Sequence, residues 1–218
     1  MKKIIEFLSA LLFPVRCIGC DADGEWLCAT CRQRLQCKRF KCSYLRAARS
    51  QAAVPLLVAA SYHQPLLQQL LQVFKYRFVA DVADILGGLL VSYLKTADRG
   101  LNFDLIIPVP LASRRLRWRS FNQSALLAQR VSQSFGWPIN GATLVRQRYS
   151  RPQVGLDARH RVRNVRQAFG VNNAAAVRGK RVLLLDDVVT TGSTLAECAT
   201  ALRAAGVREV WALVIARG

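Results

Sequence analysis

The chain has 218 residues, 52% of them hydrophobic, and its 32 lysines and arginines against 13 acidic residues give a formal net charge of +19. This length predicts one full domain with a small appendage, and the apolar fraction is sufficient for a buried core. No apolar run reaches the roughly 18–20 residues that a membrane-spanning helix needs, which argues against a transmembrane span. The large positive charge favours a polyanionic ligand or partner.

The first residues contain two lysines followed by an apolar stretch, a pattern superficially like that of an export signal. However, Glu6 interrupts the stretch, and no small-x-small cleavage site follows it before Cys17. The isoleucines and leucines recur with a 3.6-residue period, which favours a short amphipathic helix over residues 1–13. We therefore expect a cytoplasmic protein.

Six of the seven cysteines lie between residues 17 and 42. The pairs Cys17-x-x-Cys20 and Cys28-x-x-Cys31 each place two thiolates on one tight turn, and two such turns complete a tetrahedral set of ligands for a structural Zn²⁺. A disulfide scaffold is the alternative, but it fits an exported protein better than a cytoplasmic one.

The last two cysteines of this segment, Cys37 and Cys42, have a looser spacing. They belong either to a different set of ligands or to the remnant of a second metal-binding turn. The sequence leaves open which two of four cysteines would complete the shell begun by Cys17 and Cys20: Cys28, Cys31, Cys37 and Cys42.

Beyond the cysteine-rich segment, strands are expected to alternate with helices, which predicts an α/β fold with a largely parallel sheet flanked by helices. The expected elements, in chain order, are a strand at 54–61, a helix opened by Pro65, a helix at 79–94, a strand at 103–109, a helix at 122–135, a strand at 142–145, a basic and partly helical segment at 156–169, a strand at 181–186, a helix at 193–205 and a strand at 209–215. The expected division is an N-terminal helix and zinc-binding module at 1–50 and a main domain at 51–218.

Arginines are concentrated after the strand expected at 103–109, where residues 111–169 hold twelve arginines and one acid. Ligands of parallel sheets bind beyond the carboxyl ends of the strands, and the guanidinium fork suits phosphate groups. Trp118 and Phe121, which lie among the arginines, either stack on bases or anchor the core. The candidate residues for binding pyrophosphate or DNA phosphate are Pro110, Arg114, Arg115, Arg117 and Arg119.

The most informative segment begins with the apolar residues 182–185 and continues with Asp186 and Asp187. It predicts a buried strand that ends at the two acids, followed by a hydroxyl-rich turn and the start of a helix. Gly192 in that turn lets the backbone approach an anion closely, and the first N–H groups of the helix point at the anion. The two carboxylates suit the hydroxyls of a ribose, and they can hold Mg²⁺ through water or the sugar.

This segment resembles the motif by which type I phosphoribosyltransferases bind 5-phosphoribosyl-1-pyrophosphate (PRPP). The resemblance implies that PRPP is bound together with Mg²⁺, and that Asp186 and Asp187 are the candidate catalytic residues. The implied PRPP-binding residues are Asp186, Asp187, Val188, Val189, Thr190, Thr191, Gly192, Ser193 and Thr194.

Nearly the whole chain resembles the ComF/GntX family, whose members join a cysteine-rich zinc module to a type I phosphoribosyltransferase domain. Ser120 stands where the family usually has glycine, and the second cysteine cluster is reduced. The resemblance rests on the paired cysteines, on Ile107-Pro108-Val109-Pro110, on the arginine-rich run into Phe121-Asn122-Gln123-Ser124, on the stretch with Gln153, Arg159, Asn164 and Phe169, and on the PRPP motif.

The family resemblance implies a bacterial cytoplasmic protein that acts in the uptake or use of external DNA, as in natural competence. Single-stranded DNA, a helicase-like DNA translocase and DNA-processing proteins are the implied partners. The alternative is a catalytically active phosphoribosyltransferase of nucleotide metabolism with an unidentified base or amine acceptor.

Overall fold

The computed structural model describes residues 15–39, 41–45, 53–76, 81–97, 100–111, 113–147 and 168–218. The helix expected over residues 1–13 and nearly all of the basic segment at 156–169 lie outside these residues. The side chains of Arg114 and Arg115 also lie outside the described part of the chain.

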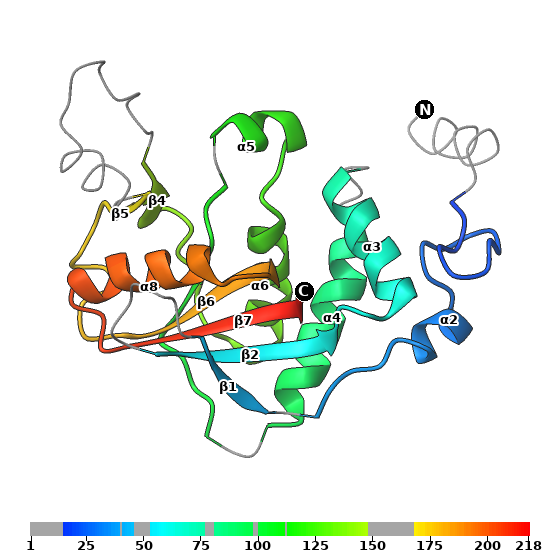
Figure 1. Ribbon diagram of the computed structural model, residues 1–218, viewed down its shortest axis with the longest axis horizontal. Helices are drawn as coiled ribbons and strands as arrows, with labels where there is room; N and C mark the ends of the chain where they lie inside the picture. Colours follow the sequence, from blue (N-terminus) through cyan, green and yellow to red (C-terminus); the bar gives the residue numbers. More distant parts are fainter. Residues whose placement is uncertain are drawn as a thin grey trace.

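A five-stranded sheet forms the centre of the fold, in the order β1-β2-β7-β6-β3 (Figure 1). Strand β1 pairs antiparallel with β2, and the remaining neighbours pair in parallel, which confirms the expected α/β architecture. The five strands are β1 (Cys42–Leu45), β2 (Val54–Ser61), β3 (Leu105–Pro108), β6 (Arg181–Val189) and β7 (Glu209–Arg217).

Helices cover both faces of the sheet, so the central strands are apolar on both sides. Leu183 and Leu185 of β6 belong to one core cluster, together with α3 (Pro65–Tyr76), α4 (Val82–Lys95) and α6 (Gln123–Phe135). Val182 and Leu184 belong to a second cluster on the other face. That cluster includes α8 (Ser193–Ala204) and the two-stranded sheet of β4 (Leu144–Arg146) and β5 (Phe169–Val171).

Strand β6 is longer than the sequence predicts. It was expected to end at Asp186, but it continues to Val189 because β7 runs beside it to the same level, with Val188 opposite Ala216 and Val189 opposite Arg217. The prediction that the two acids terminate the strand is therefore wrong. Both acids lie inside the strand, and the hydroxyl-rich turn follows its end at Val189, where the sequence predicts that turn.

Four short elements were not predicted from the sequence. They are α2 (Ala29–Gln33), α5 (Ser113–Arg119), which is built by the arginine run, and the strands β1 and β5. Strand β1 lies before residue 51 and nevertheless extends the main sheet. The division of the chain after residue 50 stays a prediction.

The cysteine-rich segment contains the short helix α2 (Ala29–Gln33) and packs on the helices of the main body. Cys17, Leu27 and Cys31 are buried in the same core cluster as the apolar faces of α3 and α4. Within the described ranges, no helix is both long enough and apolar enough to cross a bilayer.

Candidate functional site

The turn from β6 into α8 forms a small hollow lined by Asp186 and residues 188–195, with a volume of about 50 Å³. Gly192 has a φ of 78°, a left-handed conformation that glycine adopts without a steric penalty. The hydroxyls of Thr191 and Ser193 lie 3.0 Å apart in the turn. A hollow of this size, with hydroxyls on its wall, suits an anionic group such as a phosphate.

The start of α8 supplies donors to the same hollow. The first helical hydrogen bond runs from the N–H of Ala196 to the carbonyl of Gly192, at 3.0 Å, so the N–H groups of Thr194 and Leu195 have no partner inside the helix. The N–H of Ser193 donates to the hydroxyl of Thr191, at 3.4 Å. The first turn of α8, which is fully described, contains no acidic residue. The helix dipole therefore adds positive potential at this end, where an anion is stabilised.

Asp186 is held from two sides at the edge of the hollow. Its Oδ1 accepts a hydrogen bond from the hydroxyl of Ser124 in α6, at 3.0 Å, and another from the N–H of Asp187, at 2.9 Å. Burial, followed by the charge of Asp187, raises the pKa of Asp186 to about 7. The pair therefore carries less than two negative charges at neutral pH when no ligand is bound.

Asp187 is buried and forms an ion pair with a helix on the other side of the site. The ammonium of Lys75, in the last turn of α3, lies 3.1 Å from Asp187 Oδ1, which also accepts the N–H of Val188 at 2.6 Å. Sequence reasoning missed Lys75, and it named Ser124 in a family motif without foreseeing its contact with Asp186. The available signal for Lys75 was that it is the one charged residue of the otherwise apolar and amide-rich α3.

Ser124 reaches Asp186 because Asn122 fixes the start of α6. The side-chain carbonyl of Asn122 accepts the N–H of Ser124 at 3.0 Å, and its amide donates to the carbonyl of Val109 at 3.0 Å. These two bonds tie the start of α6 to the bend after β3. The ends of β3 and β6, which are adjacent parallel strands, thus lie at the same edge of the sheet.

The predicted phosphate-binding arginines of α5 occupy different environments. Arg117 is exposed, whereas Arg119 is only 7% exposed and its guanidinium lies 5.5 Å from the ring centre of Tyr76. Phe121 packs against Phe74 of the core, with ring centres 6.0 Å apart, which favours its reading as a core anchor. A role for Pro110 and these arginines in phosphate binding stays a prediction.

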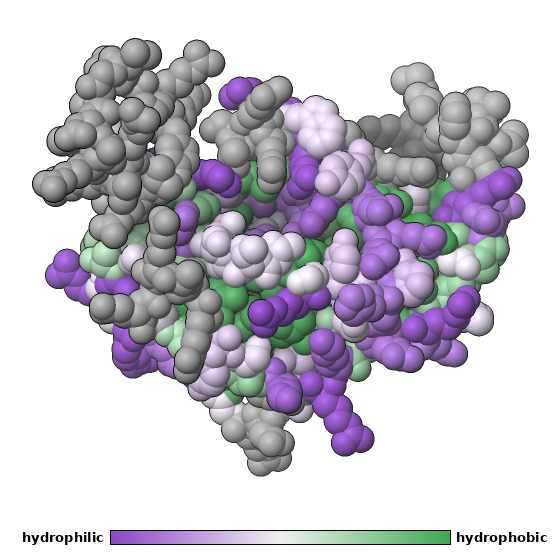
Figure 2. Space-filling view, viewed as in Figure 1, coloured by the Kyte–Doolittle hydropathy of each residue, from purple (hydrophilic) through white to green (hydrophobic). Residues whose placement is uncertain are grey.

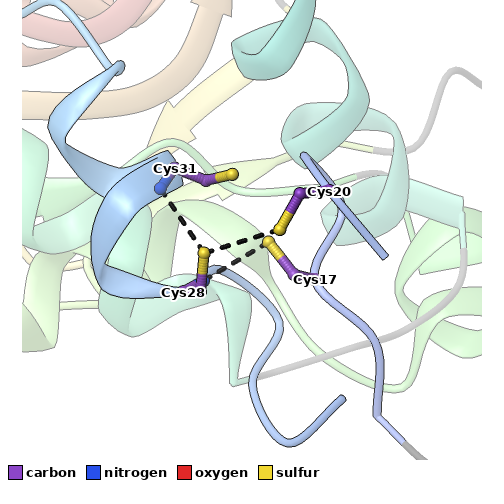
Figure 3. Close-up of side chains that lie close together, drawn as sticks. All are labelled: Cys17, Cys20, Cys28 and Cys31. Atoms are coloured by element: carbon purple, nitrogen blue, oxygen red, sulfur yellow. Dashed lines mark hydrogen bonds between the residues drawn. The ribbon is translucent and has the colours of Figure 1, made fainter. Parts of the chain in front are cut away.

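Four cysteines converge in the N-terminal segment, and Figure 3 shows their sulfurs turned toward one another. The sulfurs of Cys17, Cys20, Cys28 and Cys31 all lie within 4.8 Å of one another, and those of Cys20 and Cys28 are 3.7 Å apart. A tetrahedral site with Zn–S bonds of about 2.3 Å places its sulfurs about 3.8 Å apart. The cluster can hold a metal ion, and its spacing fits Zn²⁺.

Backbone groups already stabilise negative charge on this cluster. The N–H of Cys28 donates to the sulfur of Cys17 at 3.4 Å, and the N–H of Cys31 donates to the sulfur of Cys28 at 3.5 Å. Burial raises the pKa of Cys17, but N–H donors from Cys28 and Gly19 outweigh it and lower the value to about 6. Burial raises the pKa of Cys31 to about 12. A bound metal ion would replace the protons that remain.

Cys37 and Cys42 are not members of this cluster in the described part of the chain. The sulfur of Cys37 lies 3.9 Å from the carbonyl of Leu89 in α4, and Cys42 is the first residue of β1. The choice that the sequence left open therefore falls on Cys28 and Cys31.

Comparisons with known proteins agree with this geometry. A model of the phosphoribosyl transferase domain family matches residues 122–218, a range that includes Ser124, the acid pair and the turn into α8. The DNA utilization protein YhgH of Escherichia coli is 33% identical over 210 residues, which cover 88% of this chain and 92% of that protein. Competence protein F of Haemophilus influenzae is 32% identical over 207 residues, which cover 90% of this chain and 89% of that protein. The chain belongs to the ComF/GntX family.

The domain match gives this ComF/GntX protein a phosphoribosyltransferase fold, and the cysteine cluster and Lys75 precede the matched residues. Among solved structures, the allosteric regulatory enzyme of purine biosynthesis matches with 25% identity and a TM-score of 0.44. That match covers 63% of this chain and 25% of the enzyme's chain.

Proposed function

We propose that this ComF/GntX protein binds PRPP with Mg²⁺ at the β6–α8 turn and acts in the cytoplasm in the uptake or use of external DNA, where it binds single-stranded DNA. The observation that carries the PRPP site is the acid pair beside a hydroxyl-lined helix start. The names of the relatives, a DNA utilization protein and a competence protein, support the DNA-related role.

In the proposed complex, the 5-phosphate of PRPP accepts hydrogen bonds from the N–H groups and hydroxyls of Thr190 to Thr194. Asp186 and Asp187 accept hydrogen bonds from the ribose hydroxyls. The pyrophosphate lies toward the bend after β3, where Mg²⁺ would screen its charge and Arg114, Arg115 and Arg117 would add cations. Lys75 approaches the ribose side of the ligand through its ion pair with Asp187.

A catalytically active phosphoribosyltransferase is the second candidate, and the acid pair favours it because two carboxylates beside the ribose would stabilise the positive charge that develops on C1. In such a transfer, the bond from C1 to the pyrophosphate oxygen breaks, a bond from C1 to a base or amine forms, and the acceptor loses a proton. The residues of the site would stabilise the charge that develops on C1 and on the leaving pyrophosphate. Acceptor-dependent release of pyrophosphate from PRPP would establish this reading.

Single-stranded DNA is the proposed polyanionic partner. The twelve arginines and one acid of residues 111–169 exceed the charge that one pyrophosphate requires. Phosphate contacts by such a surface would make the affinity for DNA strongly dependent on salt. A helicase-like translocase and DNA-processing proteins are the proposed protein partners, and Zn²⁺ is the proposed structural metal of the four-cysteine cluster.

Replacement of both acids separates the two proposed ligands. We expect the double variant Asp186→Asn with Asp187→Asn to lose PRPP binding in calorimetry while it retains its affinity for a labelled single-stranded oligonucleotide. Replacement of Arg114, Arg115 and Arg117 by glutamate should weaken the binding of both ligands. A folded aspartate variant that loses DNA binding would contradict the assignment of two distinct sites.

A further inference from the structure

A second hollow, far larger than the one at the β6–α8 turn, lies between the cysteine-rich segment and helix α3. Its volume is about 840 Å³, within the range of sites that hold ligands in proteins. Figure 2 shows mostly hydrophilic side chains over α3 and a mixture of hydrophilic and hydrophobic ones over the cysteine-rich segment. The polar and aromatic residues of the lining are Arg16, Asp21, Trp26, Gln69, Gln72 and Tyr76.

Exposed aromatic rings continue from this hollow toward α5. Tyr76 is 56% exposed, and its ring centre lies 6.3 Å from that of Trp118, which is 57% exposed. The guanidinium of Arg119 lies 5.5 Å from the ring centre of Tyr76 and 6.0 Å from that of Trp118, so it supports both rings from within the protein. Large exposed aromatic side chains that are held in place in this way form a preorganised stacking surface.

The lining of the hollow suits bases better than phosphates. Among the described residues of the lining, Arg16 is the one cation, and it is already paired with Asp23 at 3.3 Å. Asp21 contributes a negative charge to the wall. Gln69 and Gln72 offer amide donors and acceptors that match the edges of a base. Positive charge is instead available next to the aromatic rings, on the exposed Arg117 of α5.

We infer that this hollow, with the rings of Trp26, Tyr76 and Trp118, is a groove that takes up the unpaired bases of single-stranded DNA. Bases stack on the aromatic rings and bond to the glutamine amides, while a neighbouring phosphate contacts the exposed Arg117 of α5. This inference rests on the proposed binding of single-stranded DNA, and it assigns that binding to the groove. It also predicts a preference for single strands, since the bases of a duplex are stacked inside the helix and are not available to the groove.

The test measures the fluorescence anisotropy of a labelled oligo-dT with the full-length protein over a series of salt concentrations. We expect Tyr76→Ala to weaken binding about tenfold or more, because a base loses its stacking partner. The slope of log affinity against log salt should stay unchanged in this variant. Arg117→Gln should instead lower that slope by about one, because it removes a phosphate contact. Tyr44→Ala is the matched control, since Tyr44 is 62% exposed but lies on the edge strand β1. This variant should bind DNA as the wild type does.

The outcomes separate this inference from the proposed function. If the wild type does not bind oligo-dT, the proposed DNA binding is wrong and the groove assignment is wrong with it. If the wild type binds but Tyr76→Ala and Trp118→Ala bind equally well, DNA binding stands and the groove is not its site. Equal affinity for a duplex of the same length would also overturn the groove. Circular dichroism and metal content should match those of the wild type in each variant, which shows that a loss of binding is not a loss of fold.

Discussion

The ammonium of Lys75 lies 3.1 Å from Asp187 Oδ1, and this ion pair joins the last turn of α3 to the acid pair on β6. The contact brings together two residues that are far apart in the sequence and places a cation inside the proposed PRPP site. In the free protein, the ammonium offsets part of the repulsion between the two neighbouring carboxylates.

Removal of this cation should weaken PRPP binding. We expect Lys75→Ala to lower the affinity for PRPP with Mg²⁺ about tenfold, since the highly anionic ligand loses a nearby positive charge. Calorimetry of the variant beside the wild type measures the change. Lys95→Ala is the matched control, because Lys95 is an exposed lysine at the end of α4. Equal affinities of Lys75→Ala and the control would show that Lys75 has no part in the site.

Gly192 is required by both its backbone conformation and its surroundings. Its φ is +78°, and an added Cβ would meet the side chain of Leu45 in β1. We expect Gly192→Ala to lower the free energy of unfolding by about 2 kcal/mol or more, from backbone strain and overpacking together. Denaturant titration measures this change.

The control for Gly192→Ala separates strain from crowding. Gly179 has a φ of +70°, but an added Cβ would meet nothing within 4 Å. Gly179→Ala should therefore cost about 1 kcal/mol, from backbone strain alone. Similar losses in the two variants would mean that the contact between the turn and β1 is not tight.

Ionisation of Asp186 should make the stability depend on pH. Burial, followed by repulsion from Asp187, raises the pKa of Asp186 to about 7, above the value of about 3.9 in an unfolded chain. The folded protein thus binds more protons between about pH 4 and pH 7, and this group's contribution to stability falls as the pH rises through that window. Asn cannot ionise, so the free energy of unfolding of Asp186→Asn should exceed that of the wild type at pH 8 by on the order of 1–3 kcal/mol. The difference between the two proteins should be smaller at pH 5.

Denaturant titrations at pH 5 and pH 8 measure this difference. Asp23→Asn serves as a surface control, because the side chain of Asp23 is 71% exposed in its pairing with Arg16. A stability gain for Asp186→Asn that is the same at both pH values would contradict the raised pKa.

The four-cysteine cluster predicts one zinc ion per chain. We expect Cys20→Ser to lose that zinc, and a strong chelator to lower the thermal midpoint of the wild type, since metal binding contributes folding energy to a small segment. Elemental analysis and thermal unfolding measure these effects. Cys37→Ser should keep its zinc, because Cys37 lies outside the cluster. Purified, reduced and folded wild type without metal would refute the site.

Local patterns predicted the elements that carry the site. The apolar residues 182–185 form a fully buried strand, and the turn at Gly192 leads into a helix as expected. The two Cys-x-x-Cys pairs converge, because each is a tight turn whose geometry is set by adjacent residues. In these cases the interactions that determine the structure join residues that are close together in the sequence.

Features that depend on tertiary contacts could not be predicted in this way. The extension of β6 past Asp186 follows from its pairing with β7, and the role of Lys75 follows from how α3 packs against the sheet. Strand β1 is four residues long and only its last residue is buried, so its sequence carries little strand pattern. The burial of Arg119 against Tyr76 is a further tertiary contact that the sequence does not predict, since nothing in the arginine run distinguishes this residue from its neighbours.

A calorimetric titration of PRPP with Mg²⁺ into the wild-type protein, with ribose 5-phosphate titrated for comparison, tests the proposed site at the β6–α8 turn. We expect saturable binding of PRPP, and weaker binding of ribose 5-phosphate to the same site, because the helix start recognises the phosphate and the remaining contacts recognise the pyrophosphate. Absence of PRPP binding by folded, zinc-loaded protein would show that the β6–α8 turn is not a working phosphoribosyl site.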